Sequence, residues 1–262
     1  MSRHVGDVAA QPVLIDREVT DEIAAIRGIP VGEASISPNR HPEIDSASDL
    51  LDMINRIRDA SGLPVGFKSV LGAYGWLEEL FEEIHKRGIE SAPDFITVDS
   101  GDGGTGAAPM PLMDCVGLPI RESLPLVVDL LKKHGLRDRI RVISSGKLIT
   151  PAGLAWALCV GADFVNSARG FMFALGCIQA LQCNKNTCPT GVTTHDPKLQ
   201  RGLVPADKAE RVANYSKSIR KEVGVIAHSC GVKEPRQLRR YHCRMVQDDG
   251  RSKPLDELYP EL

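Results

Sequence analysis

The chain has 262 residues, 42% of them hydrophobic and 25% charged, with a net charge of −2. This length allows one large domain with its own core, and the near-neutral charge gives no reason to expect nucleic-acid binding. No apolar run approaches the roughly 20 residues of a membrane helix, and the first residues lack the apolar region of a signal peptide, so we expect a cytoplasmic protein away from membranes.

Strands and helices alternate along the middle of the chain. The residue pattern predicts strands at 63–72, 94–106, 139–147 and 162–170. Helices are predicted between them, at 75–88, 121–135 and 150–161. The strands read as buried on both sides, which favours a parallel sheet built from βαβ units.

The flanking regions carry weaker patterns. One further short strand fits residues 32–38, and residues 205–233 predict a helix or a helix pair that packs on the rest of the domain. The charged, proline-containing stretch 247–262 predicts a partly mobile surface segment.

Each predicted strand ends in small or polar residues, where the chemistry of parallel α/β folds collects. The last two ends follow one another closely, as in barrels that bind a phosphate through backbone amides and a helix N-terminus. Gly146, between Ser145 and Lys147, would let the backbone approach an anion, and Ala168 and Arg169 would add amides and a positive charge. Ordinary βα turns would give the same pattern.

Three of the seven cysteines lie within twelve residues, at Cys177, Cys183 and Cys188. Their spacing does not include the C-x-x-C pair of redox motifs. Clustered thiols without an export signal favour a metal or cluster over disulfides. Spacing alone leaves a metal site and simple burial of the thiols equally open.

The stretches DFITVDSGDGGTGAAP, RVISSGKLITPAGLAWALCVGADFVNSARGFMFALGC and CNKNTCPTGVTTHDP occur in an order that resembles the FMN-binding domain of glutamate synthase. The resemblance covers most of residues 20–230. It implies an α/β fold of the (β/α)8 barrel type that binds FMN beside a [3Fe–4S] cluster. It also implies conversion of 2-oxoglutarate and ammonia to glutamate, by hydride transfer from FMN to 2-iminoglutarate.

The resemblance assigns roles to individual residues. Cys177, Cys183 and Cys188 correspond to the three cluster ligands, and three thiolates suit a three-iron cluster. Lys68 matches a lysine near the flavin, although it could simply reach solvent. Gly103 and Gly104 would contact the flavin or line the substrate pocket, with a purely structural turn as the alternative. The phosphate would lie between residues 145–147 and 168–169.

The chain departs from the family in its number of strands, because four convincing strands are half of the eight in a barrel. We therefore expect only the C-terminal half to two-thirds of the barrel. The predicted divisions are an N-terminal segment at 1–22, a partial barrel at 23–233 that includes the cluster segment 177–191, and a tail at 234–262. A protein partner or self-association would complete the barrel, and an NADPH-linked subunit or ferredoxin would supply electrons. A truncated or partner-dependent cofactor-binding subunit without catalysis of its own is the alternative.

Overall fold

The computed structural model describes residues 12–14, 19–36, 41–102 and 116–260. Its central feature is a parallel four-stranded sheet in the order β3-β4-β5-β6, which follows the order of the sequence. The bounds of the strands are β3 Gly66–Val70, β4 Phe95–Asp99, β5 Arg141–Ser145 and β6 Phe164–Asn166. The four predicted strands and their parallel pairing are confirmed, each strand being shorter than its predicted range.

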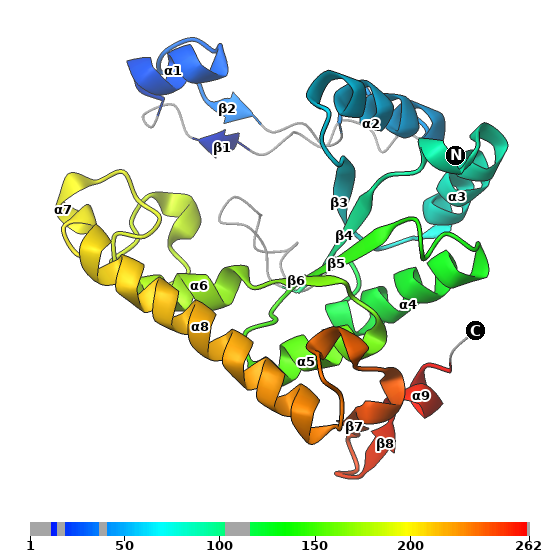
Figure 1. Cartoon of the computed structure of the whole chain (residues 1–262). Coiled ribbons are helices and arrows are strands. Elements are labelled where there is room, and N and C mark those ends of the chain that lie inside the picture. Colours follow the sequence, from blue (N-terminus) through cyan, green and yellow to red (C-terminus); the bar gives the residue numbers. More distant parts are fainter. Residues whose placement is uncertain (1–11, 15–18, 37–40, 103–115, 261–262) are drawn as a thin grey trace.

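Helices connect consecutive strands and cover one side of this sheet (Figure 1). They are α3 Gly75–Arg87, α4 Ile120–Lys133 and α5 Pro151–Val160. The start of α5 follows from its sequence, because the Thr150 hydroxyl accepts a hydrogen bond from the Gly153 amide at 3.2 Å and Pro151 occupies the first turn. These repeated βα units form part of a (β/α)8-type barrel wall, as predicted.

The two sides of the sheet differ in burial. Residues that face the helices are buried, with Ile96 at 2%, Val98 at 1% and Val142 at 0% exposure. The opposite side, here called the inner face, is open: Val70 is 43% and Phe164 48% exposed. The expectation that the strands are buried on both sides is therefore wrong for this chain. Side chains alternate between the faces of a strand, and α4 and α5 pack against one of these faces.

The N-terminal elements are not part of the four-stranded sheet. Their bounds are β1 Pro12–Leu14, α1 Asp21–Arg27, β2 Ser35–Ile36 and α2 Ala47–Ser61. The short strand expected within 32–38 is present as β2, but it pairs in antiparallel fashion with β1. Helix α2 packs against α3 and so extends the helical layer of the barrel wall.

Carboxylates fasten the strands at the end of the sheet opposite the carboxyl ends. Asp94, just before β4, accepts hydrogen bonds from the Val65 amide at 2.8 Å and from Arg58 Nε at 2.9 Å. Asp163, just before β6, accepts from the Val142 amide and from Arg137, both at 2.8 Å. The two aspartates therefore set how neighbouring strands start relative to one another.

The segment after β6 folds back along the barrel wall. It contains α6 Ala168–Leu175, α7 Pro197–Gln200 and α8 Pro205–Ser229, together with 3-10 turns at Cys183–Lys185, Pro235–Gln237 and Arg240–His242. A further 3-10 turn, Ile89–Ser91, lies between α3 and β4. Helix α8 is one continuous helix that packs against α5 and α6 (Figure 1). None of the helices in the described ranges is long and apolar enough to cross a membrane.

The C-terminal residues pack on the helical layer. They form the hairpin β7 Arg244–Val246 and β8 Ser252–Pro254, followed by α9 Leu255–Leu258. Leu255 is fully buried, and Arg240, 1% exposed, forms an ion pair with Asp129 of α4 at 2.5 Å. The expectation of a surface segment at 247–262 is therefore wrong for Leu255, because its apolar side chain completes a core contact that charge and proline content conceal.

Candidate functional site

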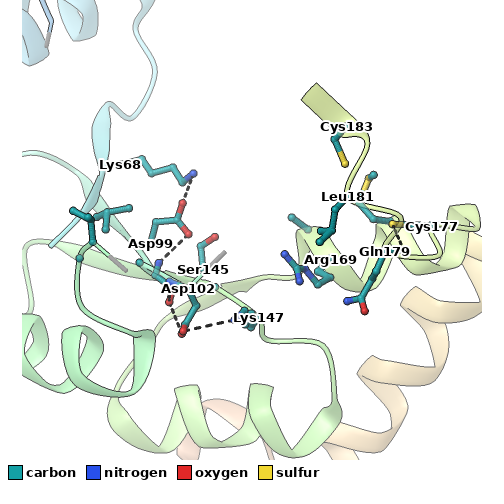
Figure 2. Close-up of a pocket in the computed structure, with 18 of the residues that line it drawn as sticks. Lys68, Asp99, Asp102, Ser145, Lys147, Arg169, Cys177, Gln179, Leu181 and Cys183 are labelled. Atoms are coloured by element: carbon teal, nitrogen blue, oxygen red, sulfur yellow. Dashed lines mark hydrogen bonds and ion pairs between the residues drawn. The ribbon is translucent and has the colours of Figure 1, made fainter. Parts of the chain in front are cut away.

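A cavity of about 730 Å³ opens at the carboxyl ends of β3 to β6, within the range of roughly 300–1,000 Å³ that is typical of small-molecule sites (Figure 2). Six of the eight predicted cofactor residues line it, namely Lys68, Ser145, Gly146, Lys147, Ala168 and Arg169. The other two, Gly103 and Gly104, lie outside the described residues. Because the cavity gathers residues from three strand ends and the start of α6, it is the candidate site.

Lys68 does not stand alone in the cavity. Its Nζ lies 2.5 Å from Asp99 Oδ2, a carboxylate at the end of the neighbouring strand (Figure 2). Asp99 pairs with Val70, which lies two residues after Lys68 on β3. The side chains of Lys68 and Asp99 therefore lie on the same face of the sheet. Sequence reasoning missed this partner, although both residues fall at adjacent predicted strand ends. The pair gives this side of the cavity a nearly neutral, hydrogen-bonding surface.

Gly146 has a structural role in addition to the predicted contact with an anion, which stays a prediction. Its φ is 137°, and a Cβ atom there would lie 2.1 Å from Cβ of Ser100. The residue is therefore a glycine because the turns after β4 and β5 touch, whether or not an anion binds. Ser100 in turn accepts a hydrogen bond from the Ile120 amide at 3.1 Å, which fixes the start of α4.

Lys147 follows this contact in a left-handed backbone conformation, with φ of 48°. Its Nζ lies 3.7 Å from Asp102 Oδ1, and the same carboxylate accepts a hydrogen bond from Ser100 Oγ at 2.8 Å. A non-glycine residue in this region costs backbone energy. The turn thus holds the lysine at the rim of the cavity beside an acidic partner (Figure 2).

The N-terminus of α6 presents backbone amides that could bind an anion. The backbone amides of Ala168, Arg169 and Gly170 have no acceptor within the described part of the chain, and Ser167 makes no capping bond to them. Arg169 is half-buried, points into the cavity (Figure 2), and forms no ion pair with any described residue. Free amides at a helix start together with an unpaired guanidinium favour a bound phosphate or carboxylate.

The three clustered cysteines lie next to this cavity. Cys177 and Cys183 contribute to its lining, and a second, small cavity of about 20 Å³ is lined by all three thiol-bearing residues, including Cys188. Apolar neighbours such as Met172 and Ile178 surround it. Nevertheless, no three histidine, cysteine or acidic side chains in the described ranges are arranged closely enough to hold a metal ion. The structure brings the thiols to one pocket without closing them around a common centre.

The pKa of the Cys188 thiol is lowered, which suits a metal-binding thiolate. Burial opposes ionisation, but hydrogen bonds from the Thr190 hydroxyl and from the backbone amides of Thr193 and Thr190 lower the pKa of Cys188 to about 6. Its sulfur lies 3.4 Å from Thr190 Oγ1. Because the thiolate is the form that binds iron, the donor set fits a three-cysteine cluster in its chemistry.

Comparison with known proteins identifies the family of the chain. A family model described as "Conserved region in glutamate synthase" matches residues 12–233. The chain belongs to the glutamate synthase family. This membership agrees with the resemblance drawn from the sequence motifs.

Two curated members of the glutamate synthase family illustrate the similarity. The glutamate synthase large subunit-like protein YerD of Bacillus subtilis is 45% identical over 92% of this chain and 46% of its own length. The archaeal glutamate synthase [NADPH] of Methanocaldococcus jannaschii is 32% identical over 85% of this chain and 43% of its own. The chain therefore spans less than half the length of each.

One similar solved structure is the recombinant flavin-binding domain of baker's yeast flavocytochrome b2. The aligned region spans 83% of this chain and 41% of the flavocytochrome b2 chain, with 17% sequence identity and a TM-score of 0.47.

Proposed function

We propose that this chain carries the FMN and iron–sulfur part of a glutamate synthase-type oxidoreductase, which reduces 2-iminoglutarate, formed from 2-oxoglutarate and ammonia, to glutamate. One observation carries the proposal. Residues from consecutive strand ends, the free start of α6 and two of the three clustered cysteines line a single cavity. Family membership and the names of the relatives support the same reaction.

The FMN phosphate would lie at the start of α6. Arg169 would neutralise its charge, and the free amides of residues 168–170 would donate to its oxygens. The turn at 145–147 would close the other side of the phosphate, with Gly146 keeping that turn against Ser100. Binding would therefore depend on one unpaired cation and on backbone amides.

Lys68 and Asp99 would lie nearer to the flavin ring, because they occupy the opposite side of the same cavity (Figure 2). A cation there stabilises negative charge on a reduced flavin. Asp99 would hold the ammonium group in place through their 2.5 Å contact. The acidic partner would also moderate the charge of Lys68 when no ligand is present.

Cys177, Cys183 and Cys188 would hold a [3Fe–4S] cluster, one thiolate for each iron. Once bound, the cluster would supply single electrons and the flavin would supply a hydride. The chain contributes three thiols around a shared apolar pocket and hydrogen bonds that favour the Cys188 thiolate. An NADPH-linked subunit or ferredoxin would supply the electrons.

A second candidate is a cofactor-binding subunit that has no catalysis of its own and depends on a partner. The open inner face favours it, because Val70 and Phe164 are strongly exposed on strands of a parallel sheet. Parallel sheets are normally covered on both faces. A partner, or a second copy of this chain, would then complete the barrel and the cavity. Size-exclusion chromatography with light scattering, alongside FMN titration, separates this candidate from a self-sufficient monomer.

The phosphate assignment is tested by titrating FMN and riboflavin into the wild-type protein and into Arg169→Ala, with quenching of flavin fluorescence as the signal. Loss of a charge-assisted hydrogen bond worth about 1.5–3 kcal/mol should weaken FMN binding roughly 10- to 150-fold. Riboflavin, which lacks the phosphate, should bind both proteins equally. Arg220→Ala on the exposed side of α8 is the matched control. Equal FMN affinity of wild type and Arg169→Ala would contradict the assignment.

The cluster is tested separately. Protein purified without oxygen, or reconstituted with iron and sulfide, should bind both in the ratio of a three-iron cluster and show the magnetic signal of an oxidised [3Fe–4S] centre. Cys183→Ser should abolish the signal, because an alkoxide is a poor ligand for a soft iron–sulfide core. Colourless wild-type protein after reconstitution would contradict the assignment.

A further inference from the structure

Tyr215 of α8 contacts Ser167, the residue just before α6, although the two residues are far apart in sequence. Its hydroxyl oxygen lies 2.8 Å from Ser167 Oγ and donates to the Ile149 carbonyl at 2.8 Å. Because the tyrosine proton goes to Ile149, Ser167 donates its own proton to the tyrosine oxygen. Ser167 therefore directs its hydroxyl toward α8.

Ser167 occupies the position at which serine normally caps a helix. An N-cap serine usually accepts a hydrogen bond from the second or third amide of the helix. Ser46 does so at α2, where its Oγ accepts from the Asp49 amide at 3.1 Å. Ser167 makes no such bond, so the amides of Arg169 and Gly170 stay open.

The surroundings of Tyr215 fix its hydroxyl at this point. Its ring packs edge-on against Phe171, with centroids 5.0 Å apart and an interplanar angle of 86°. Gly170 leaves the necessary space, since a Cβ atom there would lie 1.9 Å from the tyrosine oxygen and 2.6 Å from Ser167 Oγ. Any side chain at position 170 would push the two hydroxyl groups apart.

We propose that Tyr215 is a positioning residue for the anion site: it holds the Ser167 hydroxyl away from the start of α6 and so keeps the helix amides free for the phosphate of the flavin nucleotide. The inference rests on the proposed function for the identity of the anion. Without the tyrosine hydroxyl, Ser167 is free to cap Arg169 or Gly170, and the serine then competes with the ligand for the same amides.

The test compares wild type, Tyr215→Phe, Ser167→Ala and the double variant by titration with FMN and with riboflavin. Tyr215→Phe keeps the ring against Phe171 and should weaken FMN binding by roughly fivefold, the size of a typical N-cap effect. Riboflavin binding should not change. In the Ser167→Ala background the same substitution should have no effect, since no hydroxyl remains to cap the helix. Tyr241→Phe, on the exposed 3-10 turn, is the matched control.

Two outcomes of this titration overturn the inference. One is an unchanged ratio of FMN to riboflavin affinity in Tyr215→Phe. The other is an equal loss with and without Ser167, which would indicate a general packing effect of the tyrosine.

Amide signals in nuclear magnetic resonance separate this inference from the proposed function. In ligand-free Tyr215→Phe, the Arg169 or Gly170 amide should become more protected from hydrogen exchange, and Ser167→Ala should reverse the change. If wild type binds no FMN, the proposed function fails while this readout still decides the capping question. Unchanged amides in Tyr215→Phe would refute the role of Tyr215 whatever the flavin result.

Discussion

Removing the carboxylate of Asp129 would leave a buried guanidinium group without its counter-charge. Arg240 is 1% exposed and makes two contacts with Asp129, at 2.5 and 3.2 Å. Breaking one partner of a buried pair typically costs about 3–5 kcal/mol. The Tyr259 carbonyl, which accepts from Arg240 at 2.7 Å, remains in Asp129→Ala. We therefore expect Asp129→Ala to lower the free energy of unfolding by about 3 kcal/mol, the lower end of that range, and the melting temperature by about 6–12 °C.

Urea unfolding followed by circular dichroism measures this loss. The double variant Asp129→Leu/Arg240→Met should recover most of the stability, because an apolar pair of similar volume avoids the cost of burying two charges. Lys133→Ala is the control on the same helix, since Lys133 pairs with Glu78 at the surface and exposed pairs contribute little. A double variant as unstable as Asp129→Ala would refute the argument from the buried charge.

Two other predictions concern Asp94, just before β4, and Gly170, in the first turn of α6. Burial alone would raise the pKa of Asp94. The pKa is nevertheless held below its usual value by hydrogen bonds from the Val65 amide and Arg58 and by the charges of Arg58 and Arg139. The ionised Asp94 therefore stabilises the fold at pH values above the unfolded-state pKa of about 3.9, and this stabilisation is lost as the pH falls through the folded-state pKa. Urea midpoints of Asp94→Asn and wild type should differ at pH 7 and converge in acid, whereas a constant difference would exclude the charge as the cause. Gly170→Ala should lower stability by roughly 1–3 kcal/mol in thermal melts, because its methyl group would collide with Tyr215. Gly224→Ala, in open space on α8, should instead raise stability by about 0.5–1 kcal/mol, and equal shifts would contradict the collision.

Local patterns predicted the order of strands and helices well. The apolar runs ending in polar clusters gave all four strands of the parallel sheet, and Thr150 with Pro151 marked the start of α5. These features depend on neighbouring residues in the chain, as do helix caps and period-two alternation. The candidate site followed from the same logic, because the carboxyl ends of parallel strands meet at one edge of the sheet.

Contacts between distant residues were beyond the reach of the sequence pattern. The Lys68–Asp99 pair depends on the register of two strands, and the Tyr215–Ser167 contact on the path of α8. Gly146 was expected to admit an anion, yet its lack of a side chain is required by Ser100, which comes from the preceding strand end. The openness of the inner face agrees with the count of only four convincing strands, whereas the local pattern of each strand predicted burial on both sides.

The helix-covered side of the sheet contributes to stability, whereas the candidate binding site lies at the carboxyl ends of the strands. The helix-covered side buries Ile96, Val98 and Val142 almost completely, so packing against the helices sets the spacing of the strand ends. The cavity lies at those ends and draws its positive charge from Lys68, Lys147 and Arg169, none of which belongs to that core. The geometry of the candidate site is therefore held by the helical layer even though the inner face is open. Substitutions of Lys68 or Arg169 should consequently change binding before they change folding, which makes the flavin titrations of Arg169→Ala interpretable as tests of the site.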